Sequence, residues 1–512
     1  MIATLLLVTA ATAPAPAGGT DAYPEPLRAF LTAKAKDGQL VLKDEDRRRL
    51  AALPEHTRKL IADAIDLQIL GSAKHLRILL SLDLPSQSME LVAQDNCILC
   101  HSDPDNQKPR ALFSPDPAAQ RSNPLLNLQE FVSDAHFRRG LSCAGCHGGS
   151  PHDEAMTKEI AQRWPKEEVR HKDRSWIPDF CARCHADPNF MRGFNPTLPT
   201  DQLAKYRDSQ HGILLLTQHD SKAAQCVSCH GVHGIRNAKS RKSTIHPQRI
   251  PDTCGACHAD ASYMAGYRTA KGAPLPVSQV AEYKASVHGK ALLEKGDLGA
   301  PPCTGCHGSH AAMPPSVQSV AQVCRRCHSQ NGTFFDGSRH KLAFEQHNWP
   351  ECGECHNHHA IAKPTDSLIG ATPGTLCHDC HAQYAKTNPT CDATAAAFRS
   401  RLDALSSGRL EVTSKVEDLA EKGLDVEPIS RAAAELDEAL VQTRARVHSF
   451  DLTSFEAAAA PGTESLARAR KLEDEAQAEH RFRRKGLLTA IGFMALLAAG
   501  LSLKLREVRR RR

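Results

Sequence analysis

Aromatic residues are scarce in this chain of 512 residues. They make up 5% of the sequence, which contains three tryptophans and six tyrosines. A chain of this length can fold into several domains, each with an apolar core, and aromatic side chains usually fill much of such cores. We therefore expect that the protein's own side chains do not form the whole apolar interior.

A large excess of charge is also absent. The formal net charge is +6 at pH 7, and the stretch from Lys504 to Arg512 carries +5 of it. The rest of the chain is nearly neutral. Proteins that bind nucleic acids carry basic patches, so we expect no nucleic-acid partner.

Cysteine, by contrast, is plentiful and regularly placed, because eighteen of the nineteen cysteines belong to nine copies of Cys-x-x-Cys-His. The cysteine pairs are Cys97 and Cys100, Cys143 and Cys146, Cys181 and Cys184, Cys226 and Cys229, Cys254 and Cys257, Cys303 and Cys306, Cys324 and Cys327, Cys352 and Cys355, and Cys377 and Cys380. The histidines that complete them are His101, His147, His185, His230, His258, His307, His328, His356 and His381. Two thiols for thioether bonds and an adjacent imidazole for iron are typical of c-type haem attachment. The sequence predicts nine covalently attached haems.

Zinc sites, disulfides and thioredoxin-like sites explain this pattern less well. A zinc site takes four ligands from two paired knuckles and does not require a histidine after every cysteine pair. Neither does a disulfide framework. Thioredoxin-like chemistry uses one motif on a βαβ unit. Cys391 has no second cysteine at the right spacing and no following histidine, so we expect a free thiol there.

The spacing of the motifs predicts the fold of this region. From Cys97 to His381 there are about 32 residues for each motif. A stretch of that size rarely builds its own core. We expect the porphyrins to form the apolar interior, wrapped by short helices and loops.

Histidines outside the motifs recur in a four-fold pattern. In each copy a lone histidine comes first, then a motif closely followed by another lone histidine, then a second motif. The leading histidines are His136, His211, His288 and His340, and the trailing ones are His152, His233, His310 and His359. Two neutral imidazoles on one haem give a six-coordinate iron suited to electron transfer. We predict that these eight histidines bind iron, although the sequence does not say which haem each one serves.

The haem at Cys97 has no obvious lone histidine. His75 and His448 are candidates for it, whereas His56, His347 and Met89 are weaker ones. An iron that none of them reached would be open to a substrate. His378 lies inside a motif, and we expect it on the surface.

Both ends of the chain bear on its location. The apolar run from Leu5 to Ala11, with small residues after it, predicts a signal peptide over 1–17, with a buried helix as the alternative. Gly486 to Leu503 carries no charge and is long enough, at roughly 27 Å, to span a membrane. The larger basic cluster follows it, which predicts a cytoplasmic tail; a helix lying on the membrane surface is the alternative. Haem attachment of this type occurs outside the cytoplasm, so we expect the haems in the periplasm.

These observations predict a mainly α-helical fold with extensive loops: a multihaem cytochrome c array, then a helical bundle or stalk, then one C-terminal transmembrane helix. The segments are a signal peptide (1–17), a helical segment (18–90), a nonahaem domain (91–391), the bundle or stalk (392–485), the membrane helix (486–505) and a basic tail (506–512). Apolar spacing predicts helices from Pro54 to Leu84, and breaks at Gly423, Pro428 and Pro461 predict about three helices in the bundle. We expect this bundle to be a spacer, with a dimerisation surface as the alternative; the oligomeric state stays open.

The motifs and the shared YxxSxHG and CHGxH elements resemble periplasmic multihaem c-type cytochromes with doubled Cys-x-x-Cys-His motifs. The resemblance covers Cys97 to His381. It implies an electron carrier between a quinol-linked membrane donor and another redox protein. Pentahaem nitrite reductase and hydroxylamine oxidoreductase also belong to this broad group. The nitrite reductases commonly replace the histidine of the catalytic haem with lysine, whereas all nine motifs here end in histidine. Many quinol-oxidising members carry their anchor at the N-terminus rather than the C-terminus.

We therefore expect an electron-transfer protein of a respiratory or anaerobic chain rather than a stand-alone enzyme. Two alternatives remain. One is an oxidoreductase that acts on a small nitrogen or sulfur compound at an open haem. The other is a structural, membrane-anchored haem subunit of a larger respiratory complex.

Overall fold

The computed structural model describes most of the chain beyond the N-terminal region. The described residues are 23–32, 42, 44–66, 76–77, 79–80, 92, 98, 128–147, 174–269, 272–313, 322–384 and 389–511. Several predicted features lie outside them, namely the signal peptide at 1–17, the motif Cys97, Cys100 and His101, and the candidates His75, Met89 and His152.

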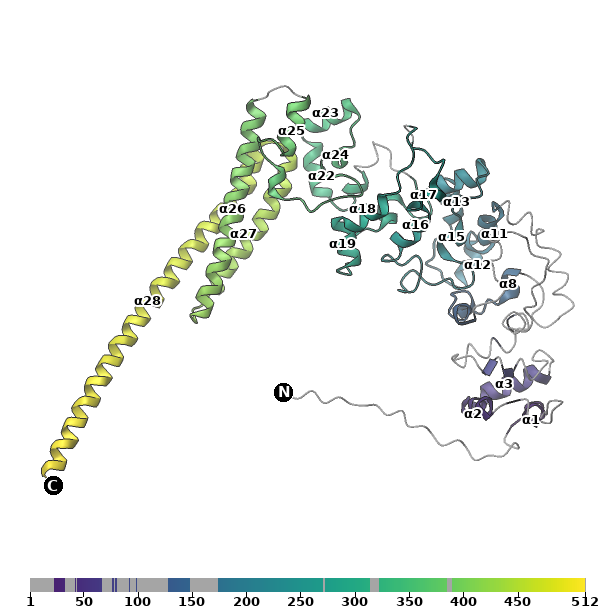
Figure 1. Cartoon of the computed structure of the whole chain (residues 1–512), viewed down its shortest axis with the longest axis horizontal. Helices are drawn as coiled ribbons and strands as arrows, with labels where there is room; N and C mark the ends of the chain where they lie inside the picture. Colours follow the sequence, from purple (N-terminus) through teal and green to yellow (C-terminus); the bar gives the residue numbers. More distant parts are fainter. Residues whose placement is uncertain are drawn as a thin grey trace. The chain divides into compact units, whose positions relative to one another are not determined.

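The described chain is mainly helical, as the sequence predicted (Figure 1). Its one β pairing within these ranges is an isolated bridge between Arg268 and Pro274. Two compact units divide the chain: the first contains Met1–Val280 and Ala291–Pro314, and the second contains Ala281–Lys290 and Pro315–Arg512. The division therefore falls between the sixth and seventh Cys-x-x-Cys-His motifs.

The N-terminal part of the first unit has its own apolar core. The helices here are α1 (Glu25–Thr32), α2 (Asp44–Ala52) and α3 (Glu55–Asp66). Ile61 and Ala64 of α3 are buried, as the predicted amphipathic helix in this region requires. The core extends to Phe131 and Phe137, so the N-terminal helices pack against the segment that leads into the Cys143 motif.

Short helices and loops make up the rest of the first unit, with few buried apolar side chains. Within the described part of this region, one small cluster forms around Tyr206, Leu215 and Ala223. The helices are α7 (Leu128–Phe131), η4 (Phe137–Arg139), α8 (Cys143–His147), α11 (Trp176–His185), α12 (Pro188–Arg192), α13 (Gln202–Arg207), α14 (Gln210–Gly212), η5 (Ile213–Thr217), α15 (Cys226–His230), α16 (Ile250–His258), α17 (Ala261–Met264) and α20 (Cys303–His307). Two further helices, α18 (Gln279–Ala285) and α19 (Val287–Leu293), contain the points where the chain passes between the units.

The second unit combines further short helices with a three-helix bundle. The short helices are α22 (Ser329–Asp336), α23 (Arg339–His347), α24 (Cys352–His356), η6 (Asp366–Leu368), α25 (Leu376–Tyr384) and η7 (Val447–Ser449). The bundle helices are α26 (Pro389–Glu421), α27 (Glu427–Arg446) and α28 (Leu452–Arg511), which lie side by side (Figure 1). Leu402, Leu436 and Phe455 are fully buried between them.

Two of the three predicted bundle breaks are present, and one is wrong. Gly423, with φ of 71°, lies in the turn between α26 and α27, and Pro428 stands in the first turn of α27. Pro461 does not end a helix, because α28 runs through it. A proline inside a helix costs about 3 kcal/mol. Burial of the neighbouring Ala459 and Leu466 against the other two helices offsets this cost.

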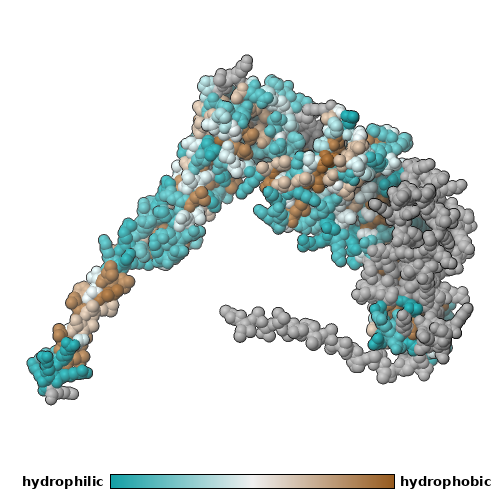
Figure 2. Space-filling model, viewed as in Figure 1, coloured by the Kyte–Doolittle hydropathy of each residue, from teal (hydrophilic) through white to brown (hydrophobic). Residues whose placement is uncertain are grey.

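The apolar end of α28 is not covered by the rest of the chain. The helix has 60 residues, which corresponds to a length of about 90 Å. Its most apolar window is 0% buried, and the exposed apolar surface is visible toward the C-terminus (Figure 2). By length and composition this segment is compatible with a single-pass membrane anchor.

Candidate cofactor site

Where a described Cys-x-x-Cys-His motif coincides with a labelled helix, the motif lies inside that helix or at its end. In α8, α15, α20 and α24 the motif is the whole helix, whereas in α11 and α16 it forms the last turn and a half. Residues i, i+3 and i+4 lie on one face of a helix. The two thiols and the imidazole of a motif therefore point to the same side, as attachment of one haem requires.

The residue after the first motif of a copy has a backbone conformation that explains the CHGxH pattern. Gly231 and Gly308 have φ of 77° and 82°, each with an extended ψ. Side chains other than glycine's are strained there. Asn357 adopts the same conformation with φ of 64°. The sharp turn directs the chain away from the motif helix toward the trailing histidine.

Seven lone histidines lie opposite seven motif histidines. In every pair the ring centres are 5.8 to 6.3 Å apart. The pairs are His136 with His185, His233 with His147, His211 with His258, His310 with His230, His288 with His328, His340 with His381, and His448 with His356.

This separation fits two imidazoles on opposite sides of one iron. Metal–imidazole bonds are about 2 Å long, so two Nε2 atoms bound to one iron lie about 4 Å apart and their ring centres roughly 6 Å apart. The Nε2 atoms of His136 and His185 are 3.5 Å apart. The residues therefore fit the predicted group.

The pairs follow a fixed register along the sequence. Each leading histidine faces the second motif of its own copy, as His211 faces His258. Each trailing histidine that has a partner lies opposite the histidine of the first motif in the preceding copy, as His310 lies opposite His230. The sequence showed the repeat but not this register, because the register depends on contacts between copies.

His448 lies elsewhere than we expected. It was a candidate ligand for the Cys97 haem, but its ring lies 6.2 Å from that of His356, which belongs to the Cys352 motif. It belongs to η7 between two bundle helices, and its Nδ1 is 3.0 Å from the carbonyl oxygen of Ala445. That contact directs Nε2 toward His356. The bundle is thus part of the candidate site, and a spacer role alone is too narrow.

Thiols of motifs that follow one another in the sequence lie close together. In the first unit, side-chain hydrogen bonds join Cys181 to Cys226 and Cys254 to Cys303. In the second unit Cys352 bonds with Cys324. Second cysteines also lie close enough to influence one another electrostatically: Cys146 and Cys184, Cys229 and Cys257, and Cys355 and Cys380. Two rows of motifs result, from Cys143 to Cys303 and from Cys324 to Cys377.

Burial favours the uncharged form of many of the paired imidazoles. Desolvation lowers the pKa of His185, His211, His230, His258, His288, His310, His356 and His448. It lowers the pKa of His340 to about 4, with help from His381. A neutral imidazole keeps a nitrogen lone pair available for a metal.

A buried carboxylate that the sequence did not single out contacts one pair. Asp134 is 2% exposed and lies 3.1 Å from Nδ1 of His136. Burial acts to raise the pKa of Asp134, but hydrogen bonds from His136 and the backbone of Ile235 bring it below its usual value. The signal was the aspartate two residues before a leading histidine, where later copies have serine.

The contacts of the remaining candidates are with other residues. His347 stacks on Trp349, His56 lies 3.4 Å from the Thr57 hydroxyl, and His378 lies 3.1 Å from Asp379. His359 is 4.0 Å from a carboxylate oxygen of Glu282 and stays a predicted ligand. Cys391 forms no disulfide within the described chain.

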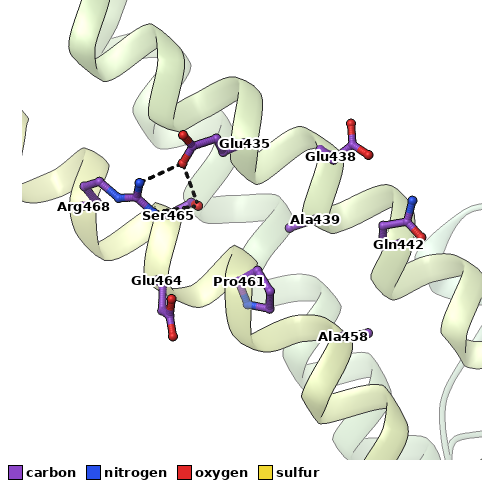
Figure 3. Close-up of a pocket in the computed structure, with 9 residues that line it drawn as sticks. All are labelled: Glu435, Glu438, Ala439, Gln442, Ala458, Pro461, Glu464, Ser465 and Arg468. Atoms are coloured by element: carbon purple, nitrogen blue, oxygen red, sulfur yellow. Dashed lines mark hydrogen bonds and ion pairs between the residues drawn. The ribbon is translucent and has the colours of Figure 1, made fainter.

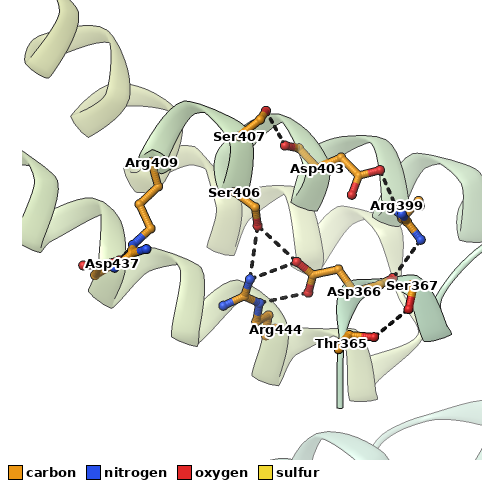
Figure 4. Close-up of polar contacts among 10 residues, drawn as sticks. All are labelled: Thr365, Asp366, Ser367, Arg399, Asp403, Ser406, Ser407, Arg409, Asp437 and Arg444. Atoms are coloured by element: carbon orange, nitrogen blue, oxygen red, sulfur yellow. Dashed lines mark hydrogen bonds and ion pairs between the residues drawn. The ribbon is translucent and has the colours of Figure 1, made fainter. Parts of the chain in front are cut away.

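A polar cluster fastens the segment before the last motif to the bundle (Figure 4). Asp366 of η6 accepts two hydrogen bonds of 2.9 Å from Arg444 of α27, and a third from Ser406 of α26 at 3.0 Å. The hydrogen bonds with Arg444 lower the pKa of Asp366 despite its burial. This cluster holds the bundle beside the motif region of the second unit.

The bundle also has a hollow between α27 and α28 (Figure 3). Glu435 bridges Arg468 and Ser465 across it, at 3.0 and 3.4 Å. Its lining contains no histidine or cysteine. The hollow therefore shares no residue with the histidine pairs.

No protein-family model, curated protein or solved structure matches this chain. Within the described ranges, no three His, Cys, Asp or Glu side chains converge to hold an ion by themselves. A haem iron takes its other ligands from the porphyrin, so the protein needs to offer it at most two, as a histidine pair does. The assignment of the residues thus depends on the motifs and the pair geometry.

Proposed function

We propose that this protein is a multihaem c-type cytochrome that relays electrons. The observation that carries the proposal is the set of seven histidine pairs, each joining one motif histidine to one lone histidine at 5.8 to 6.3 Å. When bound, haem supplies one-electron chemistry at its iron. The chain supplies two imidazoles of fixed orientation, which leave little room for the geometry to change with oxidation state.

The two rows of neighbouring thiols support a relay. Within each unit, cysteines of consecutive motifs contact or influence one another, as Cys181 and Cys226 do. Thioether bonds at these cysteines would bring the edges of consecutive haems close together. We infer that electrons pass between motifs in their sequence order within each unit.

The number of lone histidines supports closed irons. Eighteen of the 27 histidines lie outside the motifs, and adding His448 to the eight repeat histidines among them gives nine candidate ligands for nine motifs. The register that pairs trailing histidines with the preceding first motif would assign His152 to Cys97. A closed iron at every haem favours an electron conduit over an enzyme with an open haem.

The location and partners follow from the anchor. The uncovered apolar end of α28 and the basic residues after it support a single membrane span with the haems on the periplasmic side. A cytochrome held there is suited to take electrons from a quinol-linked membrane donor and pass them to another redox protein. We propose this role in a respiratory chain.

The test is a haem count together with a redox titration. The full-length chain, produced with a c-type haem maturation system and extracted in detergent, is measured by intact mass and optical spectrum. We expect nine covalent haems per chain and reversible one-electron reduction of all of them. A chain that folds without covalent haem would refute the proposal.

A further inference from the structure

We propose that Asp134 sets the redox potential of the haem at the Cys181 motif below those of the haems served by the other leading histidines. The inference rests on the proposed function, since it concerns haem ligands. Asp134 acts as a positioning residue: it contacts His136, which faces the motif histidine His185 across 3.5 Å.

The four copies of the repeat provide an internal comparison. An aromatic residue stands five positions before each leading histidine, and a polar residue stands two positions before it. That polar residue is Asp134 in the first copy and Ser209, Ser286 and Ser338 in the others. The first copy alone has a carboxylate at this position.

The serines bond to the backbone. The hydroxyl of Ser209 donates to the carbonyl oxygen of Tyr206 at 2.6 Å and accepts from the backbone N–H of Gly212 at 3.0 Å. Ser286 makes the equivalent bonds at the same distances with Tyr283 and Gly289. These hydroxyls shape the turn that presents the leading histidine, and their hydrogen bonds are to main-chain groups.

Asp134 makes a different set of bonds. Its Oδ1 accepts from the backbone N–H of His136 at 2.7 Å and lies 3.1 Å from the imidazole Nδ1. Its Oδ2 accepts from the backbone N–H of Ile235 at 2.6 Å. Ile235 also accepts from the backbone N–H of Ala135 at 2.7 Å. The carboxylate is therefore fixed on both oxygens and cannot turn away from the imidazole.

The same aspartate links two candidate ligands. Ile235 follows two residues after His233, whose ring lies 6.2 Å from that of His147. The bond from Ile235 to Asp134 thus ties the turn after His233 to the turn that carries His136. Asp134 lies between two consecutive motifs of the first row.

The chemistry gives the direction of the effect. An imidazole that donates its Nδ1 proton to a carboxylate is a more basic ligand through Nε2. Reduction adds one electron to ferric iron and lowers the positive charge at the site by one. A fixed negative charge nearby stabilises the ferric form relative to the ferrous form, and the low dielectric constant of a buried site strengthens this. The potential of this haem is therefore lowered.

Removing the charge while keeping the shape tests the inference. In Asp134→Asn the amide oxygen can still accept from the backbone N–H of His136, whereas the amide nitrogen cannot accept from that of Ile235. The matched control is Asp187→Asn. Asp187 stands two residues after His185, and its carboxylate accepts from the backbone of Asn189 and Phe190 at 2.8 and 3.2 Å. The control removes a carboxylate close in sequence to the same motif without touching its imidazoles.

The readout is an optical redox titration of the full-length haem-loaded protein, with spin state followed by electron paramagnetic resonance. We expect about one ninth of the reduction amplitude to move to higher potential in Asp134→Asn, with every haem still low-spin. A tenfold change in the ferric-to-ferrous ratio corresponds to about 59 mV for a one-electron couple. Asp187→Asn should leave the titration unchanged.

A second variant covers the case in which asparagine disturbs the fold. Asp134→Ser recreates the residue of the other copies and should give the same upward shift. An unshifted titration in a correctly loaded variant, or an equal shift in Asp187→Asn, would overturn the role of Asp134. Absence of covalent haem in the unaltered protein would instead overturn the proposed function. Failure of the role of Asp134 and failure of the proposed function are therefore distinguishable.

Discussion

His448 offers the sharpest test of a ligand that comes from the bundle. Its ring faces that of His356 at 6.2 Å, and its backbone belongs to the turn between α27 and α28. Replacing His448 with alanine would remove the second imidazole that we propose for one haem and would leave the motif at Cys352 intact. We expect that haem to become high-spin and able to bind carbon monoxide.

The size of the change follows from the number of motifs. With one proposed haem at each of the nine motifs, the carbon monoxide difference spectrum of reduced His448→Ala should correspond to about one ninth of the haem, and the covalent haem count should stay at nine. The bundle should remain folded, because its apolar core of Leu402, Leu436 and Phe455 is untouched. Circular dichroism checks this.

A matched control separates ligation from general disturbance. His347→Ala removes a histidine that stacks on Trp349 in the same unit and should leave all haems low-spin. If His448→Ala also stays entirely low-spin and does not bind carbon monoxide, the pairing of His448 with His356 is wrong. An equal response of both variants would contradict the specific role of His448.

Three further predictions test other parts of the structure. His211→Ala should make a single haem high-spin without loss of attachment, and adding it to His448→Ala should double the carbon monoxide signal; a signal that does not add would contradict separate haems. In Gly212→Ala the new Cβ would overlap a backbone carbonyl, so we expect the free energy of unfolding, measured with denaturant, to fall by about 1–3 kcal/mol. Gly193→Ala should be nearly neutral, because its Cβ would lie 3.4 Å from its nearest neighbour. Equal effects of the two variants would contradict the packing argument. Asp366→Asn should cost about 1–2 kcal/mol at pH 7, because charge-assisted hydrogen bonds are lost. Arg444 lowers the pKa of Asp366 in the folded state. This stabilisation is therefore present above the unfolded-state pKa of about 3.9 and is lost as the pH falls through the folded-state pKa. A difference in unfolding free energy between the variant and the unaltered protein that stays constant down to acid pH would contradict the ion pair.

The sequence predicted much of the helical architecture. Apolar spacing and turn residues located α3, the turn at Gly423 and the apolar end of α28. The break expected at Pro461 was wrong, because local propensity was outweighed by packing between long helices. The four-fold repeat of lone histidines was visible, since it depends on residue order alone.

The contacts between copies could not be read from the sequence. His310 faces His230 from 80 residues away, and His448 reaches His356 from outside the repeat. Both contacts depend on how helices pack, which no local pattern encodes. Asp134 was missed for a related reason. Its bond to Ile235 crosses 101 positions, so its neighbours in the sequence did not show that this carboxylate is buried.

The most direct test of closed, histidine-paired irons is the spectrum of the fully reduced, full-length protein before and after carbon monoxide is added, normalised to covalent haem. We expect nine haems and no change with carbon monoxide, because each iron would hold two imidazoles. A shift corresponding to about one haem or more in nine would contradict it and would point to an open iron at which a substrate could react.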